Sequence, residues 1–333
     1  MNFRIQSTKL SDWLSDFAKQ TGGEIKGNKV IIPQSMGEGF FELVEFTPSF
    51  YAAITELKLK EPVPSILLKV PSFMEGYFQI HLFNQKDQST LFYNDHRLGP
   101  NMVATNGVFF GSAEQSRLLG FEVGKTTSVV TLLFSSPSVR EFFPDIDNEY
   151  LEGVFYSGRP FLLQHPITPD LQKIAAKLIS PSVNSSVRGI FLHGKSLEFI
   201  SLLLDSLEEK YQGKFEFTAK PDDITRILQV REQILSDLNA HPGIPELASI
   251  AVMSESKLHK TFKQVFGKSV YQYRLEARME VARLQLISRE YSVKEVGYSL
   301  GYSNISQFIK AFKKAYGKTP KSYLKEYSLE SGE

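Results

Sequence analysis

The sequence contains no cysteine and no long uninterrupted apolar run, and both absences limit what the protein can be. Without cysteine, disulfide bonds and thiolate metal sites are excluded, and we expect a reducing compartment. No stretch of about 18 apolar residues is present, and the first residues lack the apolar core of a secretion signal. We therefore expect a soluble, cytoplasmic protein that makes no membrane contact.

Chain length and bulk composition are those of an ordinary globular protein. The 333 residues exceed the usual size of one domain, so we expect two domains. Hydrophobic residues make up 42% of the chain and charged residues 23%, a composition unlike that of a disordered chain.

Positive charge is concentrated near one end of the chain. The net charge is only +1, but residues 241–324 contain 14 basic and 6 acidic residues. Because the chain totals are 38 and 37, the remainder has 24 basic and 31 acidic residues, a balance of −7. A basic segment favours contact with nucleic-acid phosphates, although a lysine-rich solvated surface gives the same count.

Short apolar or alternating runs separated by turn residues dominate residues 30–134, and runs of this kind predict β-strands. The clearest are residues 40–46, 65–70, 77–83, 89–93, 106–111 and 128–134. Many short strands without intervening helical periods are typical of an antiparallel barrel or sandwich.

Helical periodicity replaces this pattern after Pro166, although one short helix is also expected near residues 10–20. Thr168 can cap a helix whose first residue is Pro169. A longer helix is predicted over residues 186–210 with one apolar face. That face consists of Leu197, Ile200, Leu203, Leu204 and Leu207. It either packs on the strands or pairs with a second subunit, and periodicity does not separate the two.

A polar segment containing glycine and proline, residues 211–223, interrupts the helical pattern, and we place the domain linker there. The predicted domains are residues 1–215 and 222–326. The expected fold class is α+β. The first domain contains strands over about 30–134 and helices over about 168–210, and the second domain is all-α.

The second domain contains an internal repeat, which is a strong sign of a duplicated structural unit. The two copies are residues 245–269 and 293–319. Gly267 matches Gly317 with an offset of 50, whereas Ser254 matches Ser303 with an offset of 49. One extra residue therefore lies just after the turn of the second copy.

Each copy has the pattern of a helix-turn-helix unit. The first copy predicts two short helices joined by a turn at Val252, with Ser254 as the cap of the second helix. The other copy has its turn at Gly301, followed by a helix capped by Ser303 or Asn304. A glycine suits this position because the turn needs a positive φ.

One continuous helix is predicted between the two units, over residues 270–287. Eighteen residues span about 27 Å at a rise of about 1.5 Å per residue. Recognition helices that read successive major grooves on one face of DNA lie about 34 Å apart. A rigid connector of this length can hold two such helices at that separation.

These features resemble the DNA-binding domain of the AraC family of transcription regulators, over residues 224–323. The resemblance depends on residues at fixed spacings: Leu247, Ala248, Met253, Ser254, Leu258, Phe262, Lys263, Gly267, Arg274, Arg278, Ala282, Leu286, Gly301, Tyr302, Ser303, Asn304, Phe308, Phe312, Lys313, Lys314, Gly317, Thr319, Pro320 and Tyr323. Three residues depart from the family pattern: Val252 replaces Gly, Gly297 replaces Ala, and Leu324 replaces Arg. Val252 makes a tight first turn less favourable, because β-branched residues disfavour positive φ.

The resemblance implies an effector-responsive, sequence-specific activator whose cupin-like N-terminal barrel senses a small molecule and dimerises. Residues 192–207 also resemble the siderophore-regulator branch, which implies a siderophore-like effector. The implied partners are double-stranded DNA, RNA polymerase, the effector and a second copy of the chain. A regulator whose N-terminal domain only dimerises or contacts RNA polymerase is the alternative that stays open.

Recognition helices present outward residues near their N-termini to base edges. The residues matching the family's base-contacting positions are Ser256, His259, Lys260, Asn304, Ile305, Ser306 and Lys310. The lysines Lys263, Lys313, Lys314 and Lys318 are better placed for phosphates, which fix position without reading sequence. For every one of these residues the alternative is a solvated surface position.

Aromatic residues of the predicted barrel region, residues 30–134, either line an effector cavity or form the core, and general burial preferences favour the core. They are Phe40, Phe41, Phe46, Phe50, Tyr51, Phe78, Phe109 and Phe110. The effector-binding residues themselves are not predicted.

Sequence motifs of common enzymes are absent. His81 and His96 are fifteen residues apart, and the chain has no H-x-H, H-E-x-x-H, G-x-S-x-G, P-loop or dinucleotide motif. We therefore expect no catalysis and no metal or other cofactor. The competing hypothesis is a metal-dependent barrel enzyme, for instance an oxygenase, fused to a DNA-binding module.

Overall fold

The computed structural model describes residues 3–4, 12–61, 66–68, 76–83, 90–93, 96–97, 107–112, 117–120, 123–124, 126–144, 146–158, 160–179, 183–211, 217–240 and 242–331. The chain divides into two compact units, one of residues 1–100 and 107–225, the other of residues 101–106 and 226–333. None of the described helices combines the length and apolar character needed to cross a bilayer.

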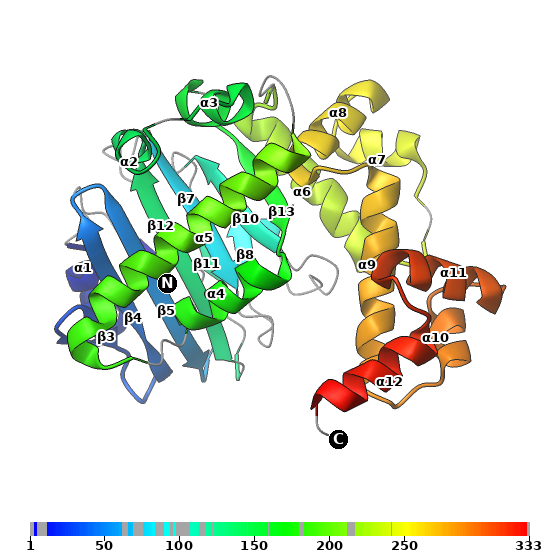
Figure 1. Cartoon of the computed structure of the whole chain (residues 1–333), viewed down its shortest axis with the longest axis horizontal. Helices are drawn as coiled ribbons and strands as arrows, with labels where there is room; N and C mark the ends of the chain where they lie inside the picture. The colour runs from blue at the N-terminus through cyan, green and yellow to red at the C-terminus, as the bar shows by residue number, and fades with distance from the viewer. Residues whose placement is uncertain are drawn as a thin grey trace. The chain divides into compact units, whose positions relative to one another are not determined.

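The first unit contains two β-sheets (Figure 1). The larger has the order β13-β10-β7-β12-β5-β4-β3-β2, and all its pairs are antiparallel. Its strands are β2 (Glu24–Lys26), β3 (Lys29–Ile31), β4 (Gly37–Thr47), β5 (Phe50–Leu59), β7 (Tyr77–Phe83), β10 (Gly107–Ser112), β12 (Thr126–Ser135) and β13 (Leu162–Pro166).

The smaller sheet has the order β1-β6-β11-β8-β9, in which only the β1-β6 pair is parallel among the described pairs. Its strands are β1 (Phe3–Arg4), β6 (Ile66–Leu68), β8 (Thr90–Tyr93), β9 (His96–Arg97) and β11 (Arg117–Gly120). The expected antiparallel architecture is therefore confirmed, with one parallel pair at its edge.

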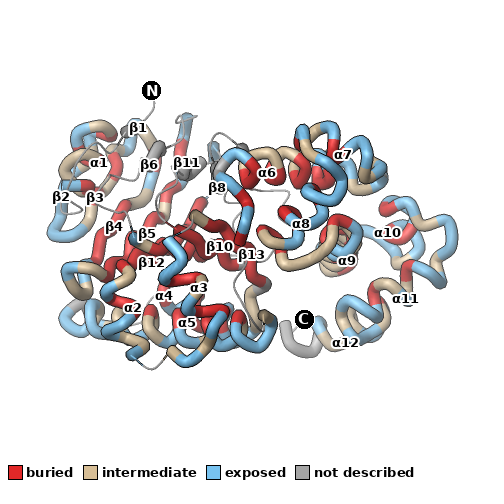
Figure 2. The backbone as a smooth tube through the Cα atoms, turned by 90° about the horizontal axis from the view of Figure 1, so that it is seen from above, coloured by how far each residue is buried: buried red, intermediate tan, exposed pale blue. Residues whose placement is uncertain are grey.

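Helices cover one face of the larger sheet. They are α2 (Ser136–Phe142), α3 (Glu149–Tyr156), α4 (Pro169–Ile179) and α5 (Arg188–Lys210), while α1 (Trp13–Thr21) packs beside β2 and β3. Figures 1 and 2 show α4 and α5 on one side of this sheet and the smaller sheet on the other. Thr168 caps α4 as expected, because its Oγ1 accepts from the Leu171 amide at 3.3 Å.

The long helix α5 buries its apolar face within the first unit. Ile200, Leu203, Leu204 and Leu207 are buried, whereas Leu197 is only half-buried. The structure thus favours packing on the sheet for most of the predicted face. The start of α5 is fixed by Arg188, whose Nη2 lies 2.8 Å from Oε2 of the buried Glu42 on β4.

Several predicted aromatic residues form a packed core on the helix-covered side of the sheet. The rings of Phe78 and Phe110 contact each other and the rings of Phe134, Phe155 and Phe161. Phe50 and Phe110 are fully buried. For these residues the core interpretation holds.

The sequence-based limits of the strand and helix regions were too narrow. β2 precedes the predicted strand region and β13 follows it, with α2 and α3 between β12 and β13. β5, one of the longest strands, was not among the runs singled out. The helix α1 begins at Trp13 rather than near residue 10. The helix α5 begins at Arg188 rather than at residue 186, after a 3₁₀ turn over Ser185–Val187.

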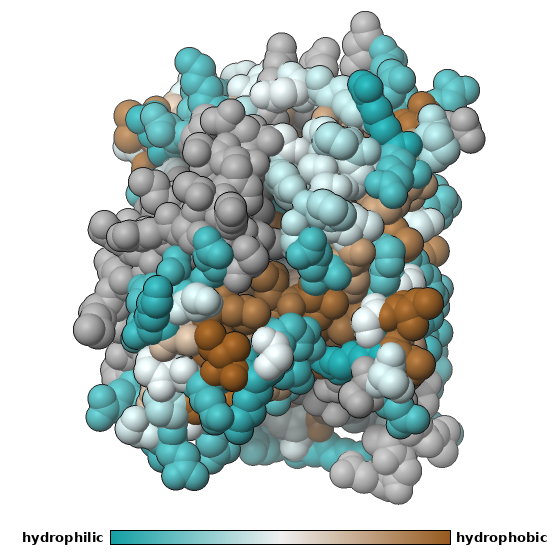
Figure 3. All heavy atoms as spheres, turned by 90° about the vertical axis from the view of Figure 1, so that its left-hand side faces the viewer, coloured by the Kyte–Doolittle hydropathy of each residue, from teal (hydrophilic) through white to brown (hydrophobic). Residues whose placement is uncertain are grey.

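In the view from the left-hand side of Figure 1, hydrophilic residues dominate the upper and lower parts of the coloured surface, and brown apolar residues gather across its middle (Figure 3). Exposed apolar residues of the first unit include Ile25, Val187 and Ile190, of which Ile190 is 77% exposed.

The second unit is helical, as predicted. Its described helices are α6 (Pro221–Ser236), from residue 226 onward, α7 (Ile244–Ile250), α8 (Glu255–Phe266), α9 (Val270–Ile287), α10 (Val293–Ser299), α11 (Ile305–Tyr316) and α12 (Pro320–Ser331). The connector α9 has the predicted bounds. α7 with α8 and α10 with α11 form the two helix-turn-helix units.

The connector α9 contributes to two separate cores. In its first half, the ring of Tyr273 packs against Phe262 and Phe266 at centroid distances of 5.4 and 4.9 Å. In its second half, Met279, Ala282 and Leu286 join a cluster with Val296, Leu300, Phe308 and Phe312. Each helix-turn-helix unit is therefore anchored on its own part of one helix.

Candidate nucleic-acid interface

The first candidate recognition helix, α8, has one buried and one exposed face. Leu258 and Phe262 are fully buried. The Ser254 hydroxyl caps the helix by accepting from the Lys257 amide at 3.3 Å, as predicted. The predicted contact residues of this helix all lie on its exposed surface: Ser256, His259, Lys260 and Lys263.

The second candidate recognition helix, α11, is capped by Asn304 rather than Ser303. The Asn304 Oδ1 accepts from the Ser306 amide at 2.8 Å, so part of this predicted base-contacting side chain orders the helix start. Phe308 and Phe312 are fully buried. The exposed predicted residues on this helix are Ser306, Lys310, Lys313 and Lys314.

Ile305 is half-buried, unlike the other predicted residues of α11. A Cβ placed on Gly297 would lie 2.8 Å from the Ile305 Cδ1, so the missing methyl at position 297 makes room for this side chain. The Gly297 departure from the family pattern is thus linked to Ile305. Part of Ile305 packs on α10 and part remains accessible to a ligand.

The two turns have the same hydrogen bonds. The Met253 amide donates to the Ala248 carbonyl at 3.0 Å, and the Tyr302 amide donates to the Gly297 carbonyl at 3.0 Å. Val252 adopts φ +50° and Gly301 φ +76°. The first turn therefore keeps the left-handed conformation although its residue is β-branched.

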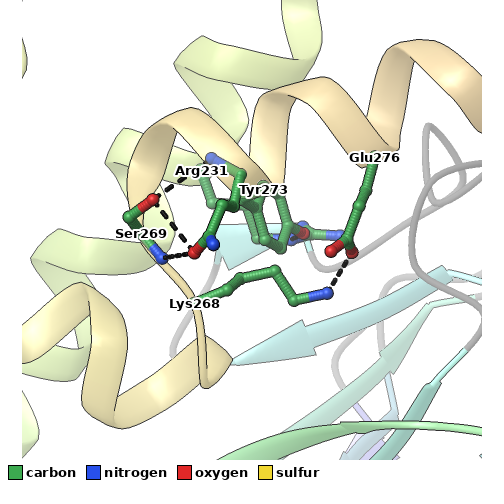
Figure 4. A network of polar contacts seen from close by, with 6 residues as sticks. Arg231, Lys268, Ser269, Tyr273 and Glu276 are labelled. Atoms are coloured by element: carbon green, nitrogen blue, oxygen red, sulfur yellow. Dashed lines mark hydrogen bonds and ion pairs between the residues drawn. The ribbon is translucent and has the colours of Figure 1, made fainter. Parts of the chain in front are cut away.

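A lysine after each recognition helix forms an ion pair at an equivalent position. Lys268 pairs with Glu276, and Lys318 pairs with Glu326. Figure 4 shows the first of these pairs beside the Ser269 cap of α9. Lys318 therefore differs from the other predicted phosphate-contacting lysines, because the Glu326 carboxylate already neutralises its charge. The sequence analysis did not predict a role for Lys268.

Buried polar contacts join α6 and the end of α10 to the connector α9. Arg231 of α6 is 1% exposed, and its Nε donates to the Tyr273 hydroxyl at 2.7 Å (Figure 4). Arg278 donates to the Leu300 carbonyl at the end of α10, and its guanidinium lies 4.5 Å from the centre of the Tyr302 ring. These roles depend on tertiary contacts and have no local sequence signal.

A second polar contact joins α9 to α11. Glu280 accepts from Arg283 Nε at 2.8 Å and from the Tyr316 hydroxyl at 2.7 Å. Burial, reinforced by the Glu280 charge, raises the pKa of Tyr316, so this hydroxyl stays protonated as a donor. The spacing of Glu280 and Arg283 on one helix is the only part visible in the sequence.

The first unit contains a pocket of about 430 Å³ between the end of α2 and α5. Its lining is Phe142, Phe143, Leu197, Glu198 and Ser201. None of the aromatic residues predicted for an effector cavity belongs to this lining. In the described part of the chain, no three His, Asp or Glu side chains are grouped as metal ligands.

Two protein families match this sequence. Residues 247–326 match a family described as a helix-turn-helix domain, and residues 38–216 match the regulatory protein PchR N-terminal domain. The second match covers more than half of the 333 residues.

Two curated relatives of this chain are a transcriptional activator and a regulatory protein. The transcriptional activator NphR of a Rhodococcus species is 30% identical over 140 residues, 40% of this chain and 41% of NphR. The regulatory protein PchR of Pseudomonas aeruginosa is 31% identical over 136 residues, 41% of this chain and 46% of PchR. The match spans less than half the length of these relatives. Among solved structures, a DNA-binding transcriptional dual regulator from Escherichia coli K-12 is 27% identical, with 34% of this chain and 99% of that chain covered and a TM-score of 0.29.

Proposed function

This chain belongs to the AraC family of transcription regulators, in the group with a PchR-type N-terminal domain, and we propose that it activates transcription by binding specific duplex DNA. In this proposal α8 and α11 enter successive major grooves on one face of the duplex. The whole protein works as an effector-responsive switch.

The observation that carries the proposal is the equivalence of the two helix-turn-helix units. Each has an aromatic face buried on α9 and an exposed polar face near the N-terminus of its recognition helix. Both turns use the same hydrogen bonds, and α9 is one uninterrupted helix. A solvated surface needs no such matched pair, whereas the two grooves of a DNA site do.

The exposed side chains have chemistry suited to base edges. Lys260 and Lys310 donate to guanine O6 or N7, and His259 bonds to a base or a phosphate. The accessible part of Ile305 packs on a thymine methyl, and Ser256, Asn304 and Ser306 complete the base contacts. Lys263, Lys313, Lys314 and Lys318 contact phosphates, for which Lys318 first gives up its ion pair with Glu326.

The first unit is the sensing and dimerisation part in this proposal, ahead of a linker within residues 211–223. Its effector is a small molecule of the siderophore type. The exposed apolar residues Val187 and Ile190 at the start of α5 favour contact with a second copy. RNA polymerase is the partner through which bound protein activates transcription.

In vitro selection from a random duplex library tests DNA recognition with the full chain. We expect enrichment of one sequence pattern with two half-sites, bound at least about a thousandfold more tightly than unselected DNA. A double Lys260→Ala, Lys310→Ala variant serves as the comparison, and the pattern it enriches lacks a preference at the two base pairs that these lysines read. Equal enrichment by both proteins, or by neither, contradicts the proposal.

A further inference from the structure

Two arginines of the connector α9, Arg274 and Arg278, lie one helical turn apart on the same side of this helix. Neither forms an ion pair with a carboxylate among the described residues. The two nearest acidic residues along α9, Glu276 and Glu280, are each paired with another basic residue. The positive charges of the two guanidinium groups are therefore not neutralised within the described part of the chain.

The hydrogen bonds of this arginine pair go to uncharged backbone carbonyls. Arg278 donates to the Leu300 carbonyl, while its buried Nε has no acceptor among the described residues. Arg274 reaches the Ala240 carbonyl at 3.4 Å, which is longer than a usual N–H···O bond. Burial, together with the charge of Arg278, lowers the pKa of Arg274. Cations removed from water in this way are normally paired with an anion.

The loop that Arg274 reaches does not provide that anion. Between α6 and α7 the chain has one described carboxylate, Asp237. Its Oδ1 accepts from the Asn239 amide at 2.8 Å and from the Ala240 amide at 3.1 Å, so this carboxylate orders the loop. The arginine pair consequently has a vacancy for an anion from outside the described chain.

The pair borders the turn that leads into the second recognition helix. A Cβ placed on Gly301 would lie 3.4 Å from the Asn239 Oδ1 and 3.7 Å from the Arg278 Nη2, so loop, turn and connector meet here. The helix α11 begins four residues after Gly301, whereas α8 packs near the start of α9 (Figure 1). The arginine pair therefore lies along α9 between the two recognition helices, beside the end of α11 that carries the predicted base contacts.

This part of α9 is open to a ligand. Tyr271, three residues before Arg274 on the same side of the helix, is 66% exposed, and Arg274 is half-buried. A guanidinium group presents N–H donors in a planar fork that matches two phosphate oxygens, and a tyrosine hydroxyl adds a third donor. Between two successive major grooves on one face of a duplex, the protein meets the phosphates that border the minor groove.

We propose that Arg274, assisted by the charge of Arg278 and the hydroxyl of Tyr271, binds a DNA backbone phosphate between the two half-sites. Arg278 keeps its bond to the Leu300 carbonyl, and Arg274 exchanges its long bond to Ala240 for the phosphate. The connector is then a third point of attachment, which fixes the position of the protein without reading a base. This inference rests on the proposed function, because it requires both recognition helices on one duplex.

Neutral phosphate analogues test the contact in the full chain. A methylphosphonate replaces one phosphate at a time in the selected DNA, and titrations compare the native protein with Arg274→Gln. At one phosphate between the half-sites, the replacement weakens native binding about tenfold, the factor expected for one charge-assisted hydrogen bond. At that position it has no further effect on Arg274→Gln. Replacements elsewhere affect both proteins equally.

The salt dependence of DNA binding is a second measurement, which a purely structural role would not change. Arg274→Gln reduces the slope of log affinity against log salt concentration by about 0.9, the value for one phosphate contact. Arg274→Lys keeps the charge and most of this slope, and Tyr271→Phe weakens binding less than Arg274→Gln does. Lys325→Gln, which removes an exposed charge on α12, is the control and leaves the slope unchanged. Circular dichroism verifies that each variant is folded.

Two results overturn the proposal. One is a folded Arg274→Gln protein whose salt slope and methylphosphonate profile equal those of the native protein. The other is a free-anion site: inorganic phosphate raises the melting temperature of the native protein more than that of Arg274→Gln, while both bind DNA alike.

Selection from the random duplex library separates this inference from the proposed function. If a pattern with two half-sites is selected but Arg274→Gln changes no phosphate contact, only this inference is wrong. If no pattern is selected, the proposed function fails. A salt slope on unselected duplex that Arg274→Gln still reduces then shows that the phosphate contact exists without sequence recognition.

Discussion

Val252 and Gly301 occupy the same position in the two helix-turn-helix turns, at φ +50° and φ +76°. For an L-residue with a β-branched side chain, the left-handed conformation is less favourable in free energy by about 1–2 kcal/mol, whereas glycine adopts it without this cost. The exposed Val252 side chain gains little packing in return. The first turn is therefore less stable than its counterpart.

Val252→Gly is expected to raise the free energy of unfolding of the second unit by about 0.5–1 kcal/mol, because the greater chain entropy of glycine offsets part of the gain. Gly301→Val is expected to lower it by about 1–2 kcal/mol. Urea titration followed by circular dichroism measures both. Trp13, the single tryptophan, reports separately on the first unit. A destabilised Val252→Gly protein would show that the valine has a packing role.

The base-contact assignment predicts two kinds of lysine variant. Lys260→Ala and Lys310→Ala each lose about 1–3 kcal/mol on the selected site and relax the preference at one base pair. The matched controls Lys263→Ala and Lys313→Ala weaken binding to all sequences and reduce the salt dependence by about one counterion each. Titrations with single-base-substituted duplexes distinguish these patterns, and unchanged base preference in both Lys260→Ala and Lys310→Ala refutes the assignment.

Arg278 is expected to stabilise the second helix-turn-helix unit more than its neighbour Arg274 does. Arg278 is 8% exposed and bonds the carbonyl at the end of α10, whereas Arg274 is half-buried and reaches the Ala240 carbonyl at 3.4 Å. Arg278→Met should cost about 2–3 kcal/mol because it removes a charge-assisted hydrogen bond and the contact with Tyr302. Arg274→Met should cost less than half of that. Equal losses in urea titrations of the two variants would contradict this role.

The stability of the first unit should fall in mild acid because of His193. Burial lowers the pKa of His193, against the opposing effect of Glu141, and its ring stacks on Phe46 at 4.8 Å. Since the unfolded chain binds the proton more readily, stability decreases as the pH falls below the ordinary histidine value of about 6.5. His193→Phe keeps the aromatic stack and removes the titration.

Melting curves of the first unit, followed through Trp13 between pH 7.5 and about pH 5.5, test this prediction. The native protein should lose more of its melting temperature over this range than His193→Phe does. His259→Gln, an exposed histidine of the second unit, is the control and should behave like the native protein. Identical slopes for the native protein and His193→Phe would exclude the role of His193.

The second unit was largely predictable from the sequence, because its helices are defined by patterns among residues close together in the chain. The apolar period and the Ser269 capping box delimit α9, and the duplicated spacing locates both recognition helices. The choice between Ser303 and Asn304 as the cap was open, since both side chains can accept an amide hydrogen bond. From the sequence, Arg278 was identified only as a residue that matches the family pattern. Its hydrogen bond was not predictable, because the acceptor is a carbonyl 22 residues away.

The first unit was less predictable because its strands pair residues far apart in the chain. β5 is buried on both faces and contains two adjacent alanines, so it lacks the alternating pattern of a half-buried strand. The Glu42–Arg188 pair joins residues 146 positions apart. The contact between His81 and Thr131 depends on the register of β7 against β12, which the sequence pattern does not fix.

The spacing of the two half-sites tests the central claim that one rigid connector presents two recognition helices to one face of the duplex. Insertion of about five base pairs between the half-sites of the selected DNA rotates one of them by half a turn. The affinity of the protein for this DNA is expected to fall nearly to that for unselected DNA. Insertions of other fractions of a helical turn should restore little of it. Affinity that is unchanged by the insertion in a quantitative binding titration would contradict it.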